Sequence, residues 1–164
     1  MSINIIIKSI KVFTIGNASS RVMFYLSMAR AFQSRRRLKR FLHSRMQKYG
    51  VYISANARIG EGIKLPHPTG VVIGGGVIIG RNVTVFQNVT LGGARVGDSK
   101  NQNYPIIGSN VVIYAGAVIV GKVSVGDNAI IGANSVVLSD VPSGATCVGV
   151  PGKAVQSRLE RSGV

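Results

Sequence analysis

The chain has few of the residues that commonly carry chemistry. Its 164 residues include no tryptophan, one cysteine, two histidines and five acids. A single cysteine excludes an internal disulfide and any cysteine-rich metal site. Cys147 falls at an inward position of the repeat described below, so we expect it to be a small buried hydrophobic residue.

The scarcity of acids leaves a net charge of +15, and the excess is concentrated near the N-terminus. Residues 1–50, here called the basic arm, contain 11 Lys and Arg and no Asp or Glu. This asymmetry indicates a polyanionic partner for the arm. The apolar run at residues 3–7 is too short to span a bilayer, and the start of the chain lacks the pattern of a secretory signal.

The basic arm has a helical pattern from about Ser20 to Tyr49. The apolar face of the first predicted helix comprises Val22, Tyr25, Leu26 and Ala29, and that of the second Leu38, Phe41, Leu42 and Met46. His43 is expected on the surface of the second helix. The helices cap the open end of a repeat structure, or they also rest on an anionic membrane surface. Nucleic-acid binding is disfavoured because no recognition-helix signature is visible.

An aliphatic residue returns every six positions over most of the remaining chain. These positions are Ile53, Ile59, Leu65, Ile73, Ile79, Val85, Leu91, Ile107, Ile113, Ile119, Val125, Ile131 and Val137. The third residue after each is usually Asn, Asp or Gly, residue types that tolerate the left-handed backbone of a sharp corner. Three such units, about 18 residues, close one coil, and stacked coils bury a continuous aliphatic column. The period therefore predicts a parallel β-helix.

The period breaks first between Leu65 and Ile73, where the step is eight residues instead of six. His67 lies in this break between two prolines, which restrict the backbone and direct the side chain outward. A histidine can serve as a base near neutral pH, so His67 is the candidate catalytic residue. Counting one coil onward predicts Gln87 directly above or below His67, with Asn88 beside it.

The second break is a polar excursion of 12 residues, 94–105, before the repeat resumes. Long loops on rigid scaffolds commonly carry binding functions, so this loop is a candidate binding element. Gly92 and Gly93 precede it and would let a ligand approach bare backbone N–H groups.

These features resemble the hexapeptide-repeat acyltransferases, and within them the serine O-acetyltransferase branch. The matching stretches are residues 59–63 (IGEGI), 67–70 (HPTG), 89–93 (VTLGG), 132–138 (GANSVVL) and 148–153 (VGVPGK). The resemblance implies a left-handed β-helix, a homotrimer, acetyl-CoA as donor and active sites between subunits. The expected fold is thus an all-β, left-handed parallel β-helix over 51–155, with a helical arm at 1–50 and a tail at 156–164.

Carried over from the family, His67 takes the proton from an acceptor hydroxyl as that oxygen attacks the thioester. Backbone N–H groups at Gly92 and Gly93 would stabilise the tetrahedral intermediate. Lys153 would meet a CoA phosphate, or is simply a solvated terminal lysine. The segment Ala115, Gly116 and Ala117 would line the CoA groove, or only pack the coil. No metal is expected.

Two residues depart from the pattern of the serine enzymes. Tyr52 stands where they carry the aspartate that pairs with the catalytic histidine. Tyr104, before Pro105 in the loop, stands where they carry a second histidine of the serine site. The acceptor site is therefore expected to differ, with Asp98 and Tyr104 as its loop residues. A backbone carbonyl or the side chains of Glu61, Asn88 and Gln87 could orient His67.

The sequence thus leads to an acetyl-CoA-dependent O-acetyltransferase acting on a sugar hydroxyl of a bacterial surface polysaccharide or its precursor. The expected location is cytoplasmic, with possible peripheral contact at the inner membrane face. One alternative is serine acetylation for cysteine synthesis. Another is a non-catalytic trimeric scaffold, which the position of His67 argues against.

Overall fold

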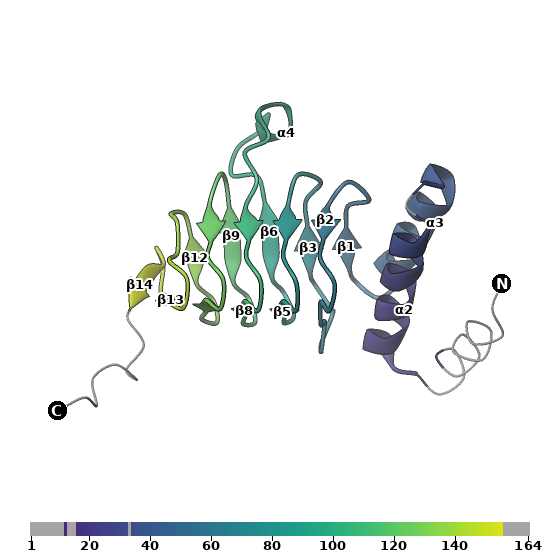
Figure 1. Cartoon of the computed structure of the whole chain (residues 1–164), viewed down its shortest axis with the longest axis horizontal. Coiled ribbons are helices and arrows are strands. Elements are labelled where there is room, and N and C mark those ends of the chain that lie inside the picture. The colour runs from purple at the N-terminus through teal and green to yellow at the C-terminus, as the bar shows by residue number, and fades with distance from the viewer. Residues whose placement is uncertain (1–11, 13–15, 33, 156–164) are drawn as a thin grey trace.

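The computed structural model describes Val12, residues 16–32 and residues 34–155. Two helices, α2 (Ala18–Ala31) and α3 (Arg36–Gln47), lie against one end of a column of short strands (Figure 1). The apolar run at residues 3–7 and the tail at 156–164, both considered above, lie outside the described residues. Among the described residues, no helix combines the length and apolar character needed to cross a membrane.

The column is a parallel β-helix with three sheets. Sheet A contains β1 (Tyr52–Ile53), β3 (Val72–Ile73), β6 (Thr90–Gly92), β9 (Val118–Val120) and β12 (Val136–Val137). Sheet B contains β2 (Arg58–Ile59), β4 (Ile78–Ile79), β7 (Ile106–Ile107) and β10 (Ser124–Val125). Sheet C contains β5 (Thr84–Val85), β8 (Val112–Ile113), β11 (Ile130–Ile131), β13 (Thr146–Val148) and β14 (Lys153–Val155). The chain visits A, B and C in turn, as the six-residue period predicts.

The register stacks the predicted aliphatic positions in columns. In sheet A, Ile53 pairs with Ile73, Ile73 with Leu91, and Leu91 with Ile119. These side chains are 3% exposed or less, so burial of apolar surface holds the coils together. In the corresponding inward column of sheet C, Cys147 pairs with Ile131 and is buried, as predicted. The last strand, β14, runs antiparallel to β13.

Left-handed residues recur in successive coils at two of the three corners, whereas at the A–B corner only Gly121 and two residues of the excursion loop, Gly97 and Gln102, have positive φ among the described residues. At the B–C corner, the positive-φ residues are Gly62, Asn82, Asn110, Asn128 and Gly144. At the C–A corner, they are Gly70, Asn88, Gly116 and Asn134. The pattern had also predicted left-handed corners at Asn56, Gly76 and Asp140. These three lie at the A–B corner and do not have positive φ, so that part of the prediction was wrong.

Helix α2 buries the residues predicted for its apolar face, whereas helix α3 does so only in part. Val22, Tyr25, Leu26 and Ala29 of α2 are all buried. In α3, however, Phe41 is 54% exposed, and the buried residues are Leu42, His43 and Met46. The expectation that His43 lies on the surface was therefore wrong. Its Nδ1 lies 2.8 Å from the carbonyl oxygen of Ile53, so the imidazole joins α3 to β1.

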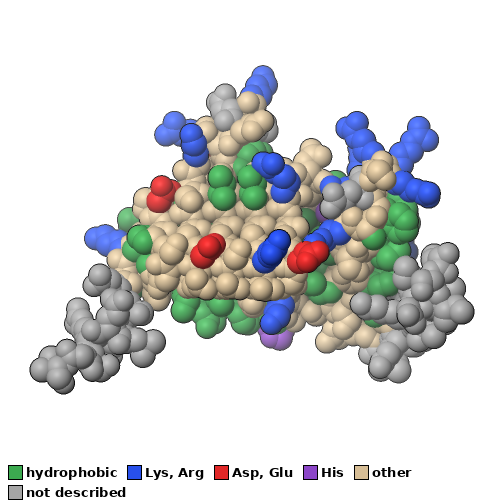
Figure 2. Space-filling view, viewed as in Figure 1, with side chains coloured by type: hydrophobic (Ala, Val, Ile, Leu, Met, Phe, Trp, Pro, Cys, Tyr) green, Lys and Arg blue, Asp and Glu red, His purple; other side chains and the backbone are tan. Residues whose placement is uncertain are grey.

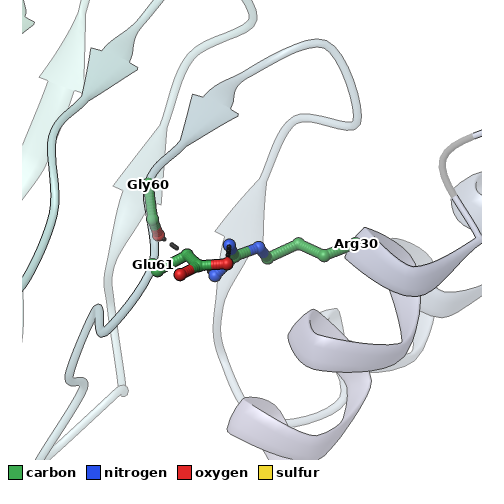
Figure 3. Close-up of polar contacts among 3 residues, drawn as sticks. All are labelled: Arg30, Gly60 and Glu61. Carbon is green, nitrogen blue, oxygen red and sulfur yellow. Dashed lines mark hydrogen bonds and ion pairs between the residues drawn. The ribbon is translucent and has the colours of Figure 1, made fainter.

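A polar contact joins α2 to the first coil (Figure 3). Arg30 donates from Nη1 to the carbonyl oxygen of Gly60 at 3.2 Å, and its Nη2 lies 3.4 Å from Oε1 of Glu61. The Glu61 side chain is 83% exposed, so the ion pair contributes little to stability, whereas the backbone contact fixes the position of the helix. In the described part of the chain the arm thus caps the open end of the β-helix.

Candidate functional site

His67 lies on a turn at the C–A corner that backbone hydrogen bonds hold in place. Val71 donates its N–H to the carbonyl oxygen of Pro68 at 3.2 Å, with Gly70 at φ +74° before it, as in a type II turn. Gly70 donates to the carbonyl oxygen of Gly50 at 2.8 Å. Pro68 is buried while His67 is exposed. The two extra residues of the break therefore form a rigid bulge that presents the imidazole to solvent.

An aromatic column, not predicted from the sequence, runs along this corner from His67. The rings of His67 and Phe86 have centroids 6.5 Å apart, and Phe86 stacks on Tyr114 at 5.3 Å with an interplanar angle of 12°. Tyr114 is 43% exposed. Phe86 and Tyr114 each directly follow an inward aliphatic residue, and this shared position in the repeat could have identified the pair.

Gln87 and Asn88 lie near this corner, but among the described residues neither makes a hydrogen bond to the imidazole. Asn88 donates its N–H to the carbonyl oxygen of Thr69 at 3.0 Å, and its side chain packs where a Cβ on Gly70 would be. The aromatic ring next to His67 is thus that of Phe86, the residue before Gln87. Asn88 supports the turn, while Oε1 of Gln87 is buried without a hydrogen-bond partner among the described residues.

Two further residues considered in the sequence analysis, Glu61 and Tyr52, have other places in the coil. Glu61 lies at the B–C corner and pairs with Arg30, so it is not beside the imidazole. Tyr52 is half exposed on the outer side of β1. Within the described part of the chain, no hydrogen bond or ion pair to the His67 ring is present.

The excursion loop leaves the β-helix at the A–B corner and carries the short helix α4 (Asp98–Asn101) (Figure 1). The carboxylate of Asp98 organises the loop. Its Oδ2 accepts the N–H groups of Ala94 and Arg95, both at 2.7 Å, and its Oδ1 accepts from Asn103 at 3.1 Å. The hydrogen bond from Asn103, followed by that from Arg95, lowers the pKa of Asp98. These contacts satisfy a carboxylate that is only 7% exposed.

Three glycines near the loop have packing reasons that the sequence did not reveal. A Cβ on Gly93 would come within 2.8 Å of Cβ of Asp98. The ring of Tyr104 packs over the backbone of Gly74 and Gly76, and a Cβ at Gly76 would overlap it. Tyr104 is thus half-buried at the A–B corner, whereas His67 lies at the C–A corner of the same chain. By contrast, a Cβ on Gly92 would meet nothing within 4 Å, so its backbone faces open space.

The residues predicted to bind acetyl-CoA fit such a ligand unevenly. Gly116 has φ +73° and lies against the side chain of Asn134, and Ala117 is fully buried in the core. Coil packing therefore explains these two small residues without a ligand. Ala115 is half-buried beside the exposed Tyr114, and Lys153 is exposed on β14. An open backbone at Gly92 and an exposed cation at Lys153 are compatible with an extended phosphorylated thioester.

Comparison with known proteins gives consistent matches. A family model described as bacterial transferase hexapeptide (six repeats) matches residues 104–139. A serine acetyltransferase of Synechococcus elongatus is 46% identical over 115 residues, which is 70% of this chain and 45% of that protein. The chain thus spans about half the length of that relative. A serine acetyltransferase of Staphylococcus epidermidis is 39% identical over 144 residues, 87% of this chain and 67% of that protein.

A solved structure described as a serine acetyltransferase in complex with CoA superposes with a TM-score of 0.75 at 34% identity. The match covers 88% of this chain and 60% of that chain. It confirms the predicted fold class, a left-handed parallel β-helix. From the repeat, the shared fold and a 39% identity that extends over two thirds of a relative, we conclude that the chain belongs to the hexapeptide-repeat transferases, in their serine acetyltransferase-like branch.

Proposed function

We propose that the protein is an acetyl-CoA-dependent O-acetyltransferase with His67 as general base. The observation that carries this proposal is the rigid turn at the C–A corner, which presents an exposed imidazole between a buried and an exposed proline. A structural role would favour a buried or bonded ring, as at His43. The turn fixes the backbone that carries the base, which limits the positions that the imidazole can take in a bound complex.

Acetyl-CoA supplies an acetyl thioester when bound. The neutral imidazole of His67 takes the proton from the acceptor hydroxyl as that oxygen bonds to the acetyl carbon. The C–S bond then breaks, and the imidazolium returns the proton to the departing sulfur, which leaves an acetyl ester and free CoA thiol. Backbone N–H groups at Gly92 and Gly93 are the candidate donors to the developing oxyanion, and a ligand can approach Gly92 because a Cβ there would meet no atom within 4 Å.

The relatives favour L-serine as the acceptor, because the curated proteins and the solved structure are serine acetyltransferases by name. This reverses the order expected from the sequence, in which a sugar came first. The expected enzyme then makes O-acetylserine. The names of these relatives support acetyl transfer but do not point to a surface polysaccharide as the acceptor.

A sugar hydroxyl stays as the second candidate because of two tyrosines. Tyr52 and Tyr104 replace the two residues that the resemblance assigns to the serine side of the site. Tyr104 is also committed to packing over Gly74 and Gly76. An acceptor site with these aromatic groups in place of an aspartate and a histidine is more suited to a neutral ring than to a small zwitterion.

The test is release of CoA thiol from acetyl-CoA with L-serine or with a panel of sugars and glycan fragments. Replacement His67→Ala is expected to reduce the rate by about 10²–10⁴-fold with the true acceptor. A matched control, His43→Gln, removes the other histidine and should leave the rate close to that of the parent chain. Full activity in His67→Ala would refute the proposed mechanism.

Trimer formation, with sites between subunits, is a second part of the proposal. His67 and the excursion loop leave different corners of one chain, so a site that uses both is easier to build from two copies. Mixing inactive His67→Ala with an inactive loop variant, Asp98→Ala, should restore part of the activity in mixed trimers. No recovery after unfolding and refolding the two together would count against sites shared between subunits.

We also propose that the enzyme acts in the cytoplasm, with the exposed cations of the arm able to contact an anionic membrane face. Figure 2 shows Lys and Arg side chains gathered at the α3 end of the molecule. Each such cation near an anionic surface contributes about 1 kcal/mol. Co-sedimentation with vesicles of phosphatidylcholine, with and without phosphatidylglycerol, tests this; equal partitioning with both would refute it.

A further inference from the structure

A groove separates α3 from the A–B corner of the first coil. It has a volume of about 680 Å³, and its wall on the coil side is formed by residues 52–56. The helix contributes Arg36, Lys39, Arg40 and His43 along one face, at the three- and four-residue spacing of neighbouring turns. The groove continues towards α2, where Arg30 and Arg58 line the adjoining hollow.

The groove is unusual in its charge. Neither hollow has an acidic residue in its lining. Arg30 is compensated by Glu61, but among the described residues no carboxylate lies within ion-pair distance of Arg36, Lys39 or Arg40. Three cations therefore line one concave site with no ion-pair partner among the described residues, although like charges on one helix face repel and destabilise it. Solvent alone does not account for placing them together in a hollow.

The lining of the groove also contains uncharged polar residues. Nδ1 of His43 carries a proton, because its partner, the Ile53 carbonyl oxygen, can only accept. The neutral ring is only 8% exposed, and His43 lines both hollows. Asn56, Ser44 and Gln47 add further hydrogen-bonding groups to the lining. A helix face meant only to cap the coil would be apolar here, as it is at Leu42 and Met46.

We propose that this groove binds a phosphate or pyrophosphate ester. Arg36 and Arg40 each offer a planar fork that matches two phosphate oxygens, and Lys39 between them supplies a point charge. The side-chain amides of Asn56 and Gln47 line the same groove and can donate further hydrogen bonds to an oxyanion, whereas the Ser44 hydroxyl already donates to the carbonyl oxygen of Phe41. The site is distinct from the turn of His67, so the proposal does not depend on acetyl transfer.

The test uses the full chain and inorganic pyrophosphate as probe, by titration calorimetry at low and at physiological ionic strength. The double variant Lys39→Gln/Arg40→Gln removes two groove cations. The matched control, Arg37→Gln/Lys48→Gln, removes two cations of the same arm that do not line the groove. We expect at least about a tenfold loss of affinity in the groove variant, as for charged hydrogen bonds, and a small change in the control.

A second readout locates the ligand. The chain has only two histidines, so the ring signals of His43 can be assigned by comparison with His67→Ala. Pyrophosphate is expected to shift the ring signals of His43 and leave those of His67 in place. Similar losses of affinity in both double variants would mean attraction to diffuse charge and would overturn the proposal. So would the absence of binding to every probe.

A parallel experiment uses vesicles of phosphatidylcholine, with and without phosphatidic acid, to distinguish a lipid headgroup from a soluble phosphate ester. If the groove variant alone loses binding to phosphatidic acid vesicles, the groove takes a lipid headgroup. If it alone loses pyrophosphate while vesicle binding is unchanged, the ligand is a soluble ester. Both results support a phosphate site, and acetyltransferase activity is not needed for either.

Discussion

The substitution Gly70→Ala tests how the turn of His67 is held. Gly70 has φ +74°, which costs an alanine about 1–2 kcal/mol relative to glycine. Its Cβ would also overlap Oδ1 of Asn88, and overpacking of this kind costs about 1–3 kcal/mol. The two effects together predict a loss of about 2–5 kcal/mol. At about 2–4 °C per kcal/mol for a chain of this size, the melting temperature should fall by at least about 4 °C.

The decisive assay is a double-mutant cycle with Asn88→Gly, measured by denaturant unfolding at one protein concentration because subunit association would affect stability. Asn88→Gly removes the overlapping side chain and keeps a residue that accepts φ +57°. The double variant should therefore be more stable than the sum of the single changes by about 0.5–3 kcal/mol. Strict additivity, or unchanged stability in Gly70→Ala, would refute the assignment of Asn88 as the support of this turn.

Three further predictions concern buried polar groups. Burial lowers the pKa of His43, and the charge of Lys39 adds to the effect, so below about pH 6.5 the unfolded chain binds more protons than the folded chain. The free energy of unfolding should therefore decrease as the pH is lowered through this range. Thermal unfolding at several pH values should show the decrease, and His43→Gln should remove it. Hydrogen bonds lower the pKa of Asp98, so its stabilisation of the loop is complete above the ordinary aspartate range and lost only in stronger acid; hydrogen exchange at Ala94 and Arg95 should rise in Asp98→Ala at neutral pH. Burial raises the pKa of the Cys147 thiol, so thiol reagents should label it only as fast as the chain opens; rapid labelling of the native protein would contradict its core position.

The repeat made most of the fold predictable because each inward position repeats the same physical requirement. Aliphatic residues that recur every six positions are buried together when short coils stack on one another. The structure confirms this stacking between Ile53 and Cys147. The corners were less predictable. Asn and Gly tolerate positive φ but do not require it, so Asn56 and Gly76 had the expected residue types at positions where φ is not positive.

The surroundings of His67 depended on coil register, which the irregular step obscures. The two extra residues shift the pairing so that Asn88 meets Gly70, and this places Phe86 next to the imidazole. His43 was assigned to the surface because its helix is strongly basic, although it is a neighbour of Leu42 and Met46 on the same face. Its burial depends on a carbonyl acceptor at Ile53, a tertiary contact that no local pattern encodes.

The glycines around the loop show why the acceptor side is harder to assign than the catalytic histidine. Gly74 and Gly76 lie beneath the ring of Tyr104, and Gly93 makes room for Asp98. From the sequence, each of these glycines could be interpreted as leaving room for a ligand. In the structure, each instead leaves room for a side chain of the same chain. The loop is thus a packed unit anchored on the coil, and Tyr104 is part of that anchor. Replacing Tyr104 with histidine would leave Gly74 and Gly76 under a smaller ring and loosen the loop. Converting the acceptor site to that of the serine enzymes would therefore require changes on both sides of this contact, not at position 104 alone.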